Sequence, residues 1–291
     1  MATTDENHRR FHLHLVSDAT GETAEKVVRA ALLQFTNVPV QLRMYTRVRL
    51  EAEMRSIIHR AKVTGALMVF TVVSTSHREL LRRLCDEKKL LLFLDGVQDG
   101  HFRTGRFQSF QRILEGVPGG DKFLPDGISM AKSLGGGIPI GAFWVRAPYA
   151  DLLGPGSHAT TFGGTPLACA VALKVLEVIQ TEKLADNTRQ LGEYLKNGLQ
   201  ELARKFPTVI RGARGLGLML GMELAPDIAK LPGDSAKPQA VRFVNLLHTA
   251  GLMTIPAGAQ VIRFLPPLNL RRSEAEEGLH IVESVVSRLV G

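Results

Sequence analysis

An uninterrupted apolar run, Leu90 to Leu94, ends at Asp95 and Gly96, and it constrains the fold more than any other segment. Short apolar runs bounded by turn residues are typical of strands that are buried on both faces of a parallel sheet. Ligands of such sheets collect at the carboxyl ends of the strands. We therefore predict a fully buried strand over residues 90–94 with a functional carboxylate at its end. The alternative is that Asp95 only forms a turn, because Asp-Gly is a common turn dipeptide.

Predicted strands and helices alternate through residues 11–86. Strands are expected over residues 11–16, 38–45 and 65–73, and helices from a polar turn at 17–23 to about residue 35, over 50–62 and over 78–88. Regular alternation of this kind implies a mostly parallel sheet.

The rest of the chain is expected to be richer in helices. Helices are predicted over residues 167–184, 187–206 and 279–290, and one glycine-rich strand over residues 212–223. We therefore expect an α/β protein of three parts, residues 1–86, residues 87–190 and a smaller C-terminal α+β domain over residues 191–291.

Composition narrows the possible classes of protein. The chain has 291 residues and a formal charge of +8, which suits anionic ligands such as phosphates and carboxylates. Aromatic residues are only 6%, and no RNA-binding signature is present, so nucleic acid is not an expected partner. Two cysteines, Cys85 and Cys169, are too few for a disulfide framework or a structural zinc site, and both are expected to be buried thiols. The polar N-terminus and the lack of a long apolar stretch predict a cytoplasmic protein without a membrane partner.

Three further motifs carry side chains suited to chemistry. Lys132 follows the apolar stretch 128–131 and precedes the glycines at 135–137, where burial would lower the pKa of its amine and make it a nucleophile. A surface lysine before a flexible loop is the alternative. Thr161 lies in a Thr-Thr-Phe-Gly-Gly segment before Pro166, and Arg263 lies in a strand-like run from Gln260 to Pro267. A guanidinium there suits paired hydrogen bonds to a carboxylate, and a structural salt bridge is its alternative.

These motifs occur in the order found in class III pyridoxal-phosphate aminotransferases, and residues 85–291 resemble that family, most closely its acetylornithine and ornithine types. The resemblance implies a mostly parallel sheet from a truncated large domain of fold type I. It also implies pyridoxal 5'-phosphate as cofactor, with an amino acid and a 2-oxo acid as small-molecule partners. The expected reaction is transamination of an ornithine- or acetylornithine-like donor with 2-oxoglutarate.

The resemblance assigns a role to each motif. Lys132 would condense with the cofactor's aldehyde, Asp95 would pair with the pyridine nitrogen, and Gln98 would lie beside the phenolic oxygen. Thr161 would bind the phosphate of the neighbouring subunit's cofactor, so the resemblance implies a homodimer with a shared site. Arg263 would bind the substrate's α-carboxylate. Gly96 departs from the family's usual Asp-Glu-Val-Gln pattern, because it stands where a glutamate is common.

Residues 11–84 resemble a different family, the bacterial regulatory proteins of pyruvate, phosphate dikinase and phosphoenolpyruvate synthase, most specifically over residues 11–24. The chain would then be a chimera that lacks the N-terminal half of the aminotransferase large domain. A nucleotide-binding regulatory module that uses the 17–23 turn, or a non-catalytic fusion, are the alternative functions. No phosphate-binding Gly-x-x-x-x-Gly-Lys loop is present. Ser74 to His77, between a predicted strand and a predicted helix, is the remaining candidate for binding phosphate at a helix N-terminus.

Overall fold

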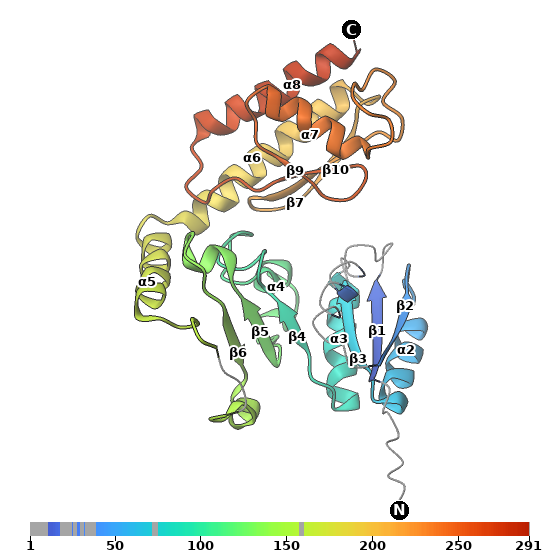
Figure 1. The fold of residues 1–291 in the computed structure, drawn as a ribbon, viewed down its shortest axis with the longest axis vertical. Coiled ribbons are helices and arrows are strands. Elements are labelled where there is room, and N and C mark those ends of the chain that lie inside the picture. The colour runs from blue at the N-terminus through green and yellow to red at the C-terminus, as the bar shows by residue number, and fades with distance from the viewer. Residues whose placement is uncertain are drawn as a thin grey trace, which may run out of the picture. The chain divides into compact units, whose positions relative to one another are not determined.

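The computed structural model of the chain describes residues 11–17, 25, 28, 29, 32, 39–71, 75–156 and 160–290. The chain divides into two compact units, Met1–Leu92 and Phe93–Gly291 (Figure 1). The boundaries expected at residues 86 and 190 stay predictions. No helix in the described ranges is long and apolar enough to cross a membrane.

The first unit is a parallel α/β layer. Its elements are β1 (Phe11–Ser17), β2 (Val40–Tyr45), α2 (Glu51–Thr64), β3 (Leu67–Thr71) and α3 (Thr75–Lys88). The strand order is β2-β1-β3, and β1 is parallel to both neighbours. Three strands and two helices predicted in this region are thereby confirmed. The predicted 17–23 turn and the helix to about residue 35 lie mostly outside the described residues.

Burial in this unit follows the spacing of its apolar side chains. Helix α2 buries Met54, Ile57, Ile58 and Ala61, which share one helical face. The helix ends at Gly65, whose φ of 64° lets its N–H reach the carbonyls of the last turn. Leu15 and Leu84 are fully buried in the unit's two apolar clusters.

The second unit begins with a small mixed sheet. It consists of β4 (Phe93–Asp95), β5 (Gly127–Met130) and β6 (Ala142–Val145) in that order. Strand β5 pairs in parallel with β4 and antiparallel with β6. Asp95 lies opposite Ser129 in this register.

The prediction of a fully buried strand over residues 90–94 is wrong. The strand starts only at Phe93, and the side chains of Leu91 and Phe93 are 43% and 49% exposed. The first residue of the run belongs to the end of α3 instead, because Lys89 takes a left-handed φ of 56° and Leu90 N–H donates to the Cys85 carbonyl. Strand β4 is also the first strand in the order β4-β5-β6, so within this sheet it pairs with β5 alone.

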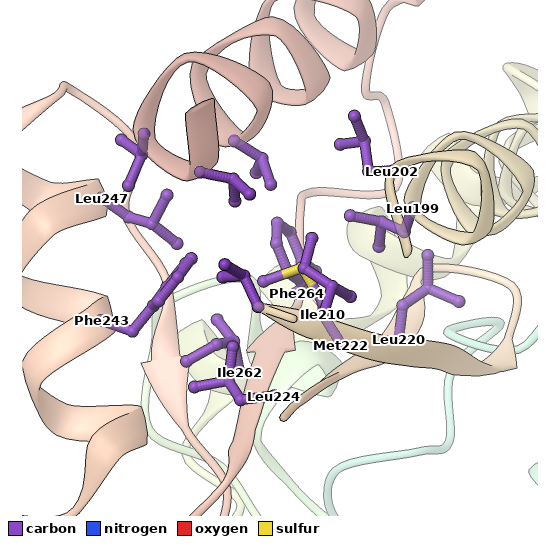
Figure 2. Packing of buried hydrophobic residues seen from close by; sticks show 14 of the residues in the cluster. Leu199, Leu202, Ile210, Leu220, Met222, Leu224, Phe243, Leu247, Ile262 and Phe264 are labelled. Carbon is purple, nitrogen blue, oxygen red and sulfur yellow. The ribbon is translucent and has the colours of Figure 1, made fainter. Parts of the chain in front are cut away.

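A four-stranded antiparallel sheet follows, with helices that bury a large apolar cluster against it. Its strands are β7 (Ile210–Leu216), β8 (Met219–Leu224), β9 (Ile255–Pro256) and β10 (Val261–Phe264), in the order β7-β8-β10-β9. The helices are α6 (Leu184–Lys205), α7 (Gln239–Thr249) and α8 (Arg272–Val290). Figure 2 shows Leu199 of α6, Phe243 of α7 and Met222 of β8 converging in this cluster, and all three side chains are fully buried.

Two predictions in this region need correction. The single strand expected over residues 212–223 is a hairpin, because Gly215 and Gly217 have positive φ angles of 135° and 54° and the chain reverses after Leu216. Helix α8 begins at Arg272, seven residues before the predicted start at Leu279.

The remaining elements are short, apart from α5 (Pro166–Thr181). They are α4 (Ser109–Ile113), η1 (Gly120–Lys122), η2 (Lys132–Gly135) and η3 (Ala147–Leu153). Helix α5 starts one residue before the predicted start at Leu167 and ends three residues before the predicted end at Leu184. The Thr165 hydroxyl caps it by accepting from Ala168 N–H at 3.4 Å. Of the two cysteines, Cys85 is buried, but Cys169 on α5 is exposed, so the prediction of two buried thiols is half wrong.

Candidate functional site

Asp95 and Ser129 close the carboxyl ends of two neighbouring parallel strands, β4 and β5. Asp95 Oδ1 accepts hydrogen bonds from Ser129 Oγ and from Val97 N–H, both at 3.1 Å. Among the described residues, nothing donates to its second oxygen, Oδ2. The carboxylate is therefore held in one orientation and keeps one oxygen available to a ligand.

Lys132 lies three residues beyond Ser129, at the same edge of this sheet. It begins η2 with a left-handed φ of 48°, after the extended Ala131. Its side chain is exposed, and within the described chain its ammonium group has no ion-pair partner. The burial expected of this lysine is therefore not found. Asp95 ends β4 and Lys132 follows β5, the parallel neighbour of β4, and the roles expected of both residues stay predictions.

His101 is a residue of this region that sequence reasoning missed. It is fully buried with a φ of 53°, and its Nδ1 is hydrogen-bonded to Ser133 Oγ at 3.2 Å, next to Lys132. Burial lowers the pKa of His101, so the imidazole is neutral at physiological pH. Its Nε2 is buried without a hydrogen-bond partner among the described residues. A lone histidine in a polar loop carries no periodicity or spacing that predicts such burial.

Gln98 and Arg263 contact each other directly. Arg263 Nη1 donates to Gln98 Oε1 at 2.6 Å in a partly buried position. Arg263 lies on β10 between Gly221 of β8 and Ile255 of β9. The four-stranded antiparallel sheet thus places Arg263 beside the loop that follows β4. The structure thereby brings together the predicted cofactor ligand Gln98 and the predicted substrate ligand Arg263.

Arginine side chains join the loop after β4 to the region of the four-stranded sheet and to helix α6. Arg103 Nη1 donates to the Pro266 carbonyl, and Leu218 N–H donates to the Arg103 carbonyl at 3.0 Å. Arg189 of α6 donates through Nε to the Gly105 carbonyl at 3.0 Å. The segment Arg103 to Arg106 is thus a structural anchor.

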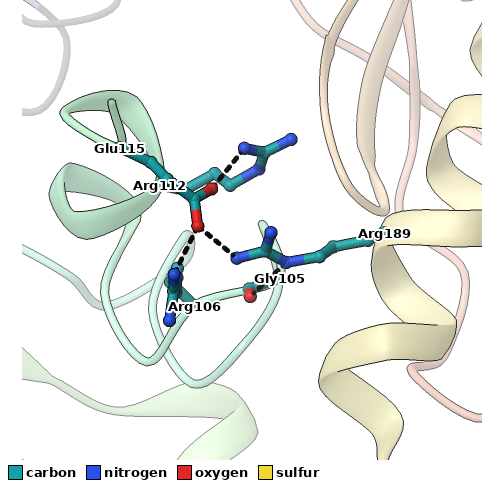
Figure 3. A network of polar contacts seen from close by, with 5 residues as sticks. All are labelled: Gly105, Arg106, Arg112, Glu115 and Arg189. Carbon is teal, nitrogen blue, oxygen red and sulfur yellow. Dashed lines mark hydrogen bonds and ion pairs between the residues drawn. The ribbon is translucent and has the colours of Figure 1, made fainter. Parts of the chain in front are cut away.

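The Glu115 carboxylate forms ion pairs with three arginines near this anchor. Figure 3 shows its carboxylate facing Arg106, Arg112 and Arg189. Hydrogen bonds from Arg106 first, and then from Arg189, lower the pKa of Glu115 to about 2. The group therefore stays ionised at any physiological pH and holds the loop against α6.

Thr161 is not joined to the other predicted site residues. It is exposed, and no hydrogen bond or ion pair in the described ranges connects it to Asp95, Lys132 or Arg263. Its neighbour Thr160 accepts from Gly163 N–H at 3.1 Å, which closes the turn before α5.

Two segments that were predicted to bind phosphate or a nucleotide lie mostly outside the residues that the structure describes. The 17–23 turn is described only at Ser17, and Ser74 together with the side chains of residues 75–77 is likewise outside the described residues. The described residues contain no cluster of side chains suited to a metal ion.

Comparisons with known proteins agree on an aminotransferase family. The sequence profile described as "Aminotransferase class-III" matches residues 49–286. The acetylornithine aminotransferase of Gloeobacter violaceus is 43% identical over 209 residues, which are 72% of this chain and 47% of that protein. The chain therefore spans about half the length of the curated relative it matches.

Solved structures agree on the fold. The ornithine aminotransferase of Toxoplasma gondii ME49 has a TM-score of 0.73 at 25% identity, with 96% of this chain and 65% of that chain covered. A transaminase from a marine Virgibacillus has a TM-score of 0.76 over 97% of this chain and 68% of that chain. At 19% identity, this second likeness bears on the fold alone.

Proposed function

This chain belongs to the class-III aminotransferase family. We propose that the carboxyl ends of strands β4 and β5 bind pyridoxal 5'-phosphate, and that the bound cofactor is used in a transamination. The proposed amino donor is ornithine or acetylornithine, and the proposed acceptor is 2-oxoglutarate, as the kinship with acetylornithine aminotransferases suggests. The observation that carries the proposal is the oriented carboxylate of Asp95 beside the strand that leads to Lys132.

The residues at this edge fit the cofactor chemically. The family is dependent on pyridoxal phosphate, which acts when bound as an electron sink for the substrate's α-carbon. Asp95 has one oxygen free of hydrogen bonds from the described chain, so it can hold a proton on a pyridine nitrogen. Lys132 offers a primary amine that no acidic side chain among the described residues neutralises.

Each residue of the site then has a defined task. Lys132 would hold the cofactor through its Nζ and would carry a proton to or from the substrate's α-carbon. Asp95 would keep the cofactor's ring nitrogen protonated, and Gln98 would orient the ring at its phenolic oxygen. Arg263 binds a substrate carboxylate, since its planar guanidinium matches two carboxylate oxygens.

Trapping the cofactor on its lysine tests this proposal. The chain is mixed with pyridoxal phosphate, reduced with borohydride and digested, and the modified lysine is located by mass spectrometry. We expect the label at Lys132, and we expect Lys132→Arg to lose it. Lys183→Arg is the matched control, because Lys183 is also an exposed lysine with a left-handed φ of 53°. A label spread evenly over surface lysines would show that the site does not exist.

We also propose a homodimer in which Thr161 serves the partner's cofactor. In support, Thr161 is exposed and unconnected to its own chain's site. The apolar side chains that follow it, Phe162 and Leu167, are 83% and 70% exposed. Neighbouring exposed apolar groups of this size are typical of interaction surfaces.

Sedimentation of the chain at micromolar concentration tests the homodimer. We expect a dimer for the wild type and a monomer for Phe162→Asp. Val63→Asp, which charges another exposed apolar position, on α2, should stay dimeric. A monomeric wild type would refute the shared site.

A separate origin of residues 11–84 stays a proposal as well. It is supported by the resemblance of residues 11–24 to the regulatory proteins and by the compact unit that ends at Leu92. The family profile, which begins at residue 49, overlaps the second half of that segment.

A further inference from the structure

His101 is a buried histidine that the proposed transamination does not use. Its side chain is fully buried, and its Nδ1 is hydrogen-bonded to Ser133 Oγ at 3.2 Å. This is the ring's single hydrogen bond within the described chain, because Nε2 is buried without a partner there. A buried polar atom without a partner costs free energy, which an apolar side chain at this position would avoid. The contact with Ser133 therefore explains the histidine better than the stability of its loop does.

The backbone is strained at both ends of this contact. His101 and Phe102 have left-handed φ angles of 53° and 66°. Lys132, which directly precedes Ser133, has a φ of 48°. A residue with a Cβ atom rarely adopts this conformation, and it persists only where surrounding contacts hold it. One hydrogen bond thus connects the two chain segments that contain these three strained residues.

The segment that carries His101 is itself held firmly. His101 N–H donates to the Phe107 carbonyl at 2.6 Å, and the two rings meet edge-on with their centroids 5.8 Å apart. The residues that follow are joined to helix α6, because Arg189 donates through Nε to the Gly105 carbonyl at 3.0 Å. The His101 ring is therefore a fixed point from which Ser133 is held.

Helix η2 is packed at its end and depends on this contact near its beginning. Leu134 is buried, and a Cβ atom added at Gly136 would lie 2.7 Å from Val175 of α5. The side chain of Lys132 has no hydrogen bond or ion pair with any described residue. Its direction is set by the backbone angles of Lys132, which fix the Cα–Cβ bond relative to the preceding strand. Release of Ser133 would let Lys132 leave the left-handed conformation and would point its amine elsewhere.

We propose that His101 is a positioning residue for the cofactor lysine. Through Ser133 it keeps Lys132 in the strained conformation that directs the amine to the pyridoxal-phosphate site. This inference rests on the proposed role of Lys132 in holding the cofactor. His101 touches neither cofactor nor substrate in this account and carries no proton. It restricts the freedom of Lys132 before the cofactor arrives, and such preorganisation raises affinity.

Trapping of pyridoxal 5'-phosphate over a range of concentrations measures this contribution. The chain is equilibrated with the cofactor, reduced with borohydride and digested, and the labelled fraction of Lys132 gives an apparent Kd. His101→Phe keeps a buried ring but removes the hydrogen bond, so this Kd should rise by about threefold to tenfold, the effect of one hydrogen bond. His101→Asn places an amide atom near the position of Nδ1 and should keep most of the affinity.

His248→Phe is the matched control. It removes another histidine hydrogen bond, which joins α7 to the Thr254 carbonyl at 2.7 Å, and it should leave the Kd at Lys132 unchanged. Ser133→Ala removes the other half of the contact at a half-buried position. In that background His101→Phe should add nothing to the Kd, because both changes break the same bond.

Hydrogen exchange of the cofactor-free chain provides a readout that needs no cofactor. His101→Phe should speed the exchange of peptides that contain residues 132–136 by severalfold, and His248→Phe should not. Unchanged exchange in this segment would overturn the inference, because Ser133 would then be held without His101.

The trapping outcomes separate this inference from the proposed function. If Lys132 is labelled with the same Kd in the wild type and in H101F, the inference fails and the proposed function stands. An equal loss in H101F and H101N, or a further loss when H101F is added to S133A, also overturns it. If the wild type is not labelled at Lys132, the proposed function fails, and this inference fails with it. Should H101F not fold, S133A decides alone: a weaker Kd supports the contact, and an unchanged Kd overturns it.

Discussion

Gly96 and Gln108 share one small volume beside the site. A Cβ atom added at Gly96 would overlap Gln108 Oε1 and lie 3.1 Å from the Ser129 carbonyl oxygen. Gln108 is only 3% exposed, so its side chain has little room to withdraw. The buried amide of Gln108 therefore fills the space next to the position where the family commonly has a glutamate, and glycine is the residue that fits.

Gly96→Ala should lower the free energy of unfolding by about 1–3 kcal/mol, because it overpacks a closed space. The double variant with Gln108→Ala should recover part of that loss. Urea denaturation provides the measurement, and Gly212→Ala is the control, because a Cβ there would meet nothing within 4 Å. Equal losses in the two glycine variants would contradict the steric account.

A second prediction at the scale of single residues concerns His101 and pH. Because burial lowers its pKa below 6.5, the folded chain leaves His101 neutral where the unfolded chain protonates it. Stability that depends on this group therefore falls as the pH drops through 6.5. His14 is buried as well and has a pKa lowered by burial and by Arg43, so it adds a slope of the same sign.

His101→Phe should reduce the loss of stability between pH 7.5 and 5.5, measured by urea denaturation at several pH values. The phenyl ring keeps the edge-on contact with Phe107, so the loss of titration is the main change. An unchanged slope in this variant would show that His101 titrates alike in both states.

At the scale of elements, the arginines around Glu115 decide how firmly the loop after β4 is held. The lowered pKa of Glu115, about 2 against an ordinary value near 4.5, means that its contribution is complete above pH 4.5. The contribution is lost as the pH falls from 4.5 towards 2, because the unfolded chain takes up the proton first.

Glu115→Gln should therefore destabilise the chain at pH 7 by about 1 kcal/mol, the upper end for partly exposed ion pairs. The difference from the wild type should shrink at pH 3. Urea denaturation at the two pH values gives both numbers. Glu177→Gln, which breaks the exposed pair with Lys174 on α5, should have little effect at either pH.

The elements that the sequence predicts well are those whose local pattern and tertiary role agree. Helix α2 has one apolar face and a glycine at its end, and β1 is rich in strand-forming residues, so both were predictable. The run at residues 90–94 misled because its first residue completes the end of α3, through a bond from Leu90 N–H to the Cys85 carbonyl that an apolar pattern does not reveal. The hairpin of β7 and β8 was missed because its turn depends on glycines that also occur inside strands.

The candidate site follows the same division. The sequence predicted that Asp95 ends a strand, and it does end β4. The contact between Gln98 and Arg263 joins residues 165 positions apart, and the burial of His101 depends on a loop without regular structure. Neither is encoded in a local pattern.

At the scale of the whole molecule, each compact unit has its own apolar core. Leu199 is fully buried in the cluster of α6, α7, α8 and the antiparallel sheet, and Leu84 is fully buried in the cluster of the first unit. Removal of either side chain leaves a cavity in a core that the other does not share.

Leu199→Ala and Leu84→Ala should each cost about 2–5 kcal/mol of unfolding free energy in the unit that contains the cavity. Hydrogen exchange followed by mass spectrometry locates the effect. Leu199→Ala should speed exchange mainly within residues 184–290, and Leu84→Ala mainly within residues 39–88. A uniform increase over the whole chain in both variants would show that the two units unfold as one.

The unequal burial of the two thiols has a practical consequence. Cys169 is exposed on the first turn of α5, whereas Cys85 in the first unit is only 4% exposed. A maleimide dye should therefore attach to the native chain once, at Cys169, and twice only after denaturation. The unmodified sequence thus already provides a single attachment point for a fluorophore on the helix next to Thr161, without any engineered cysteine.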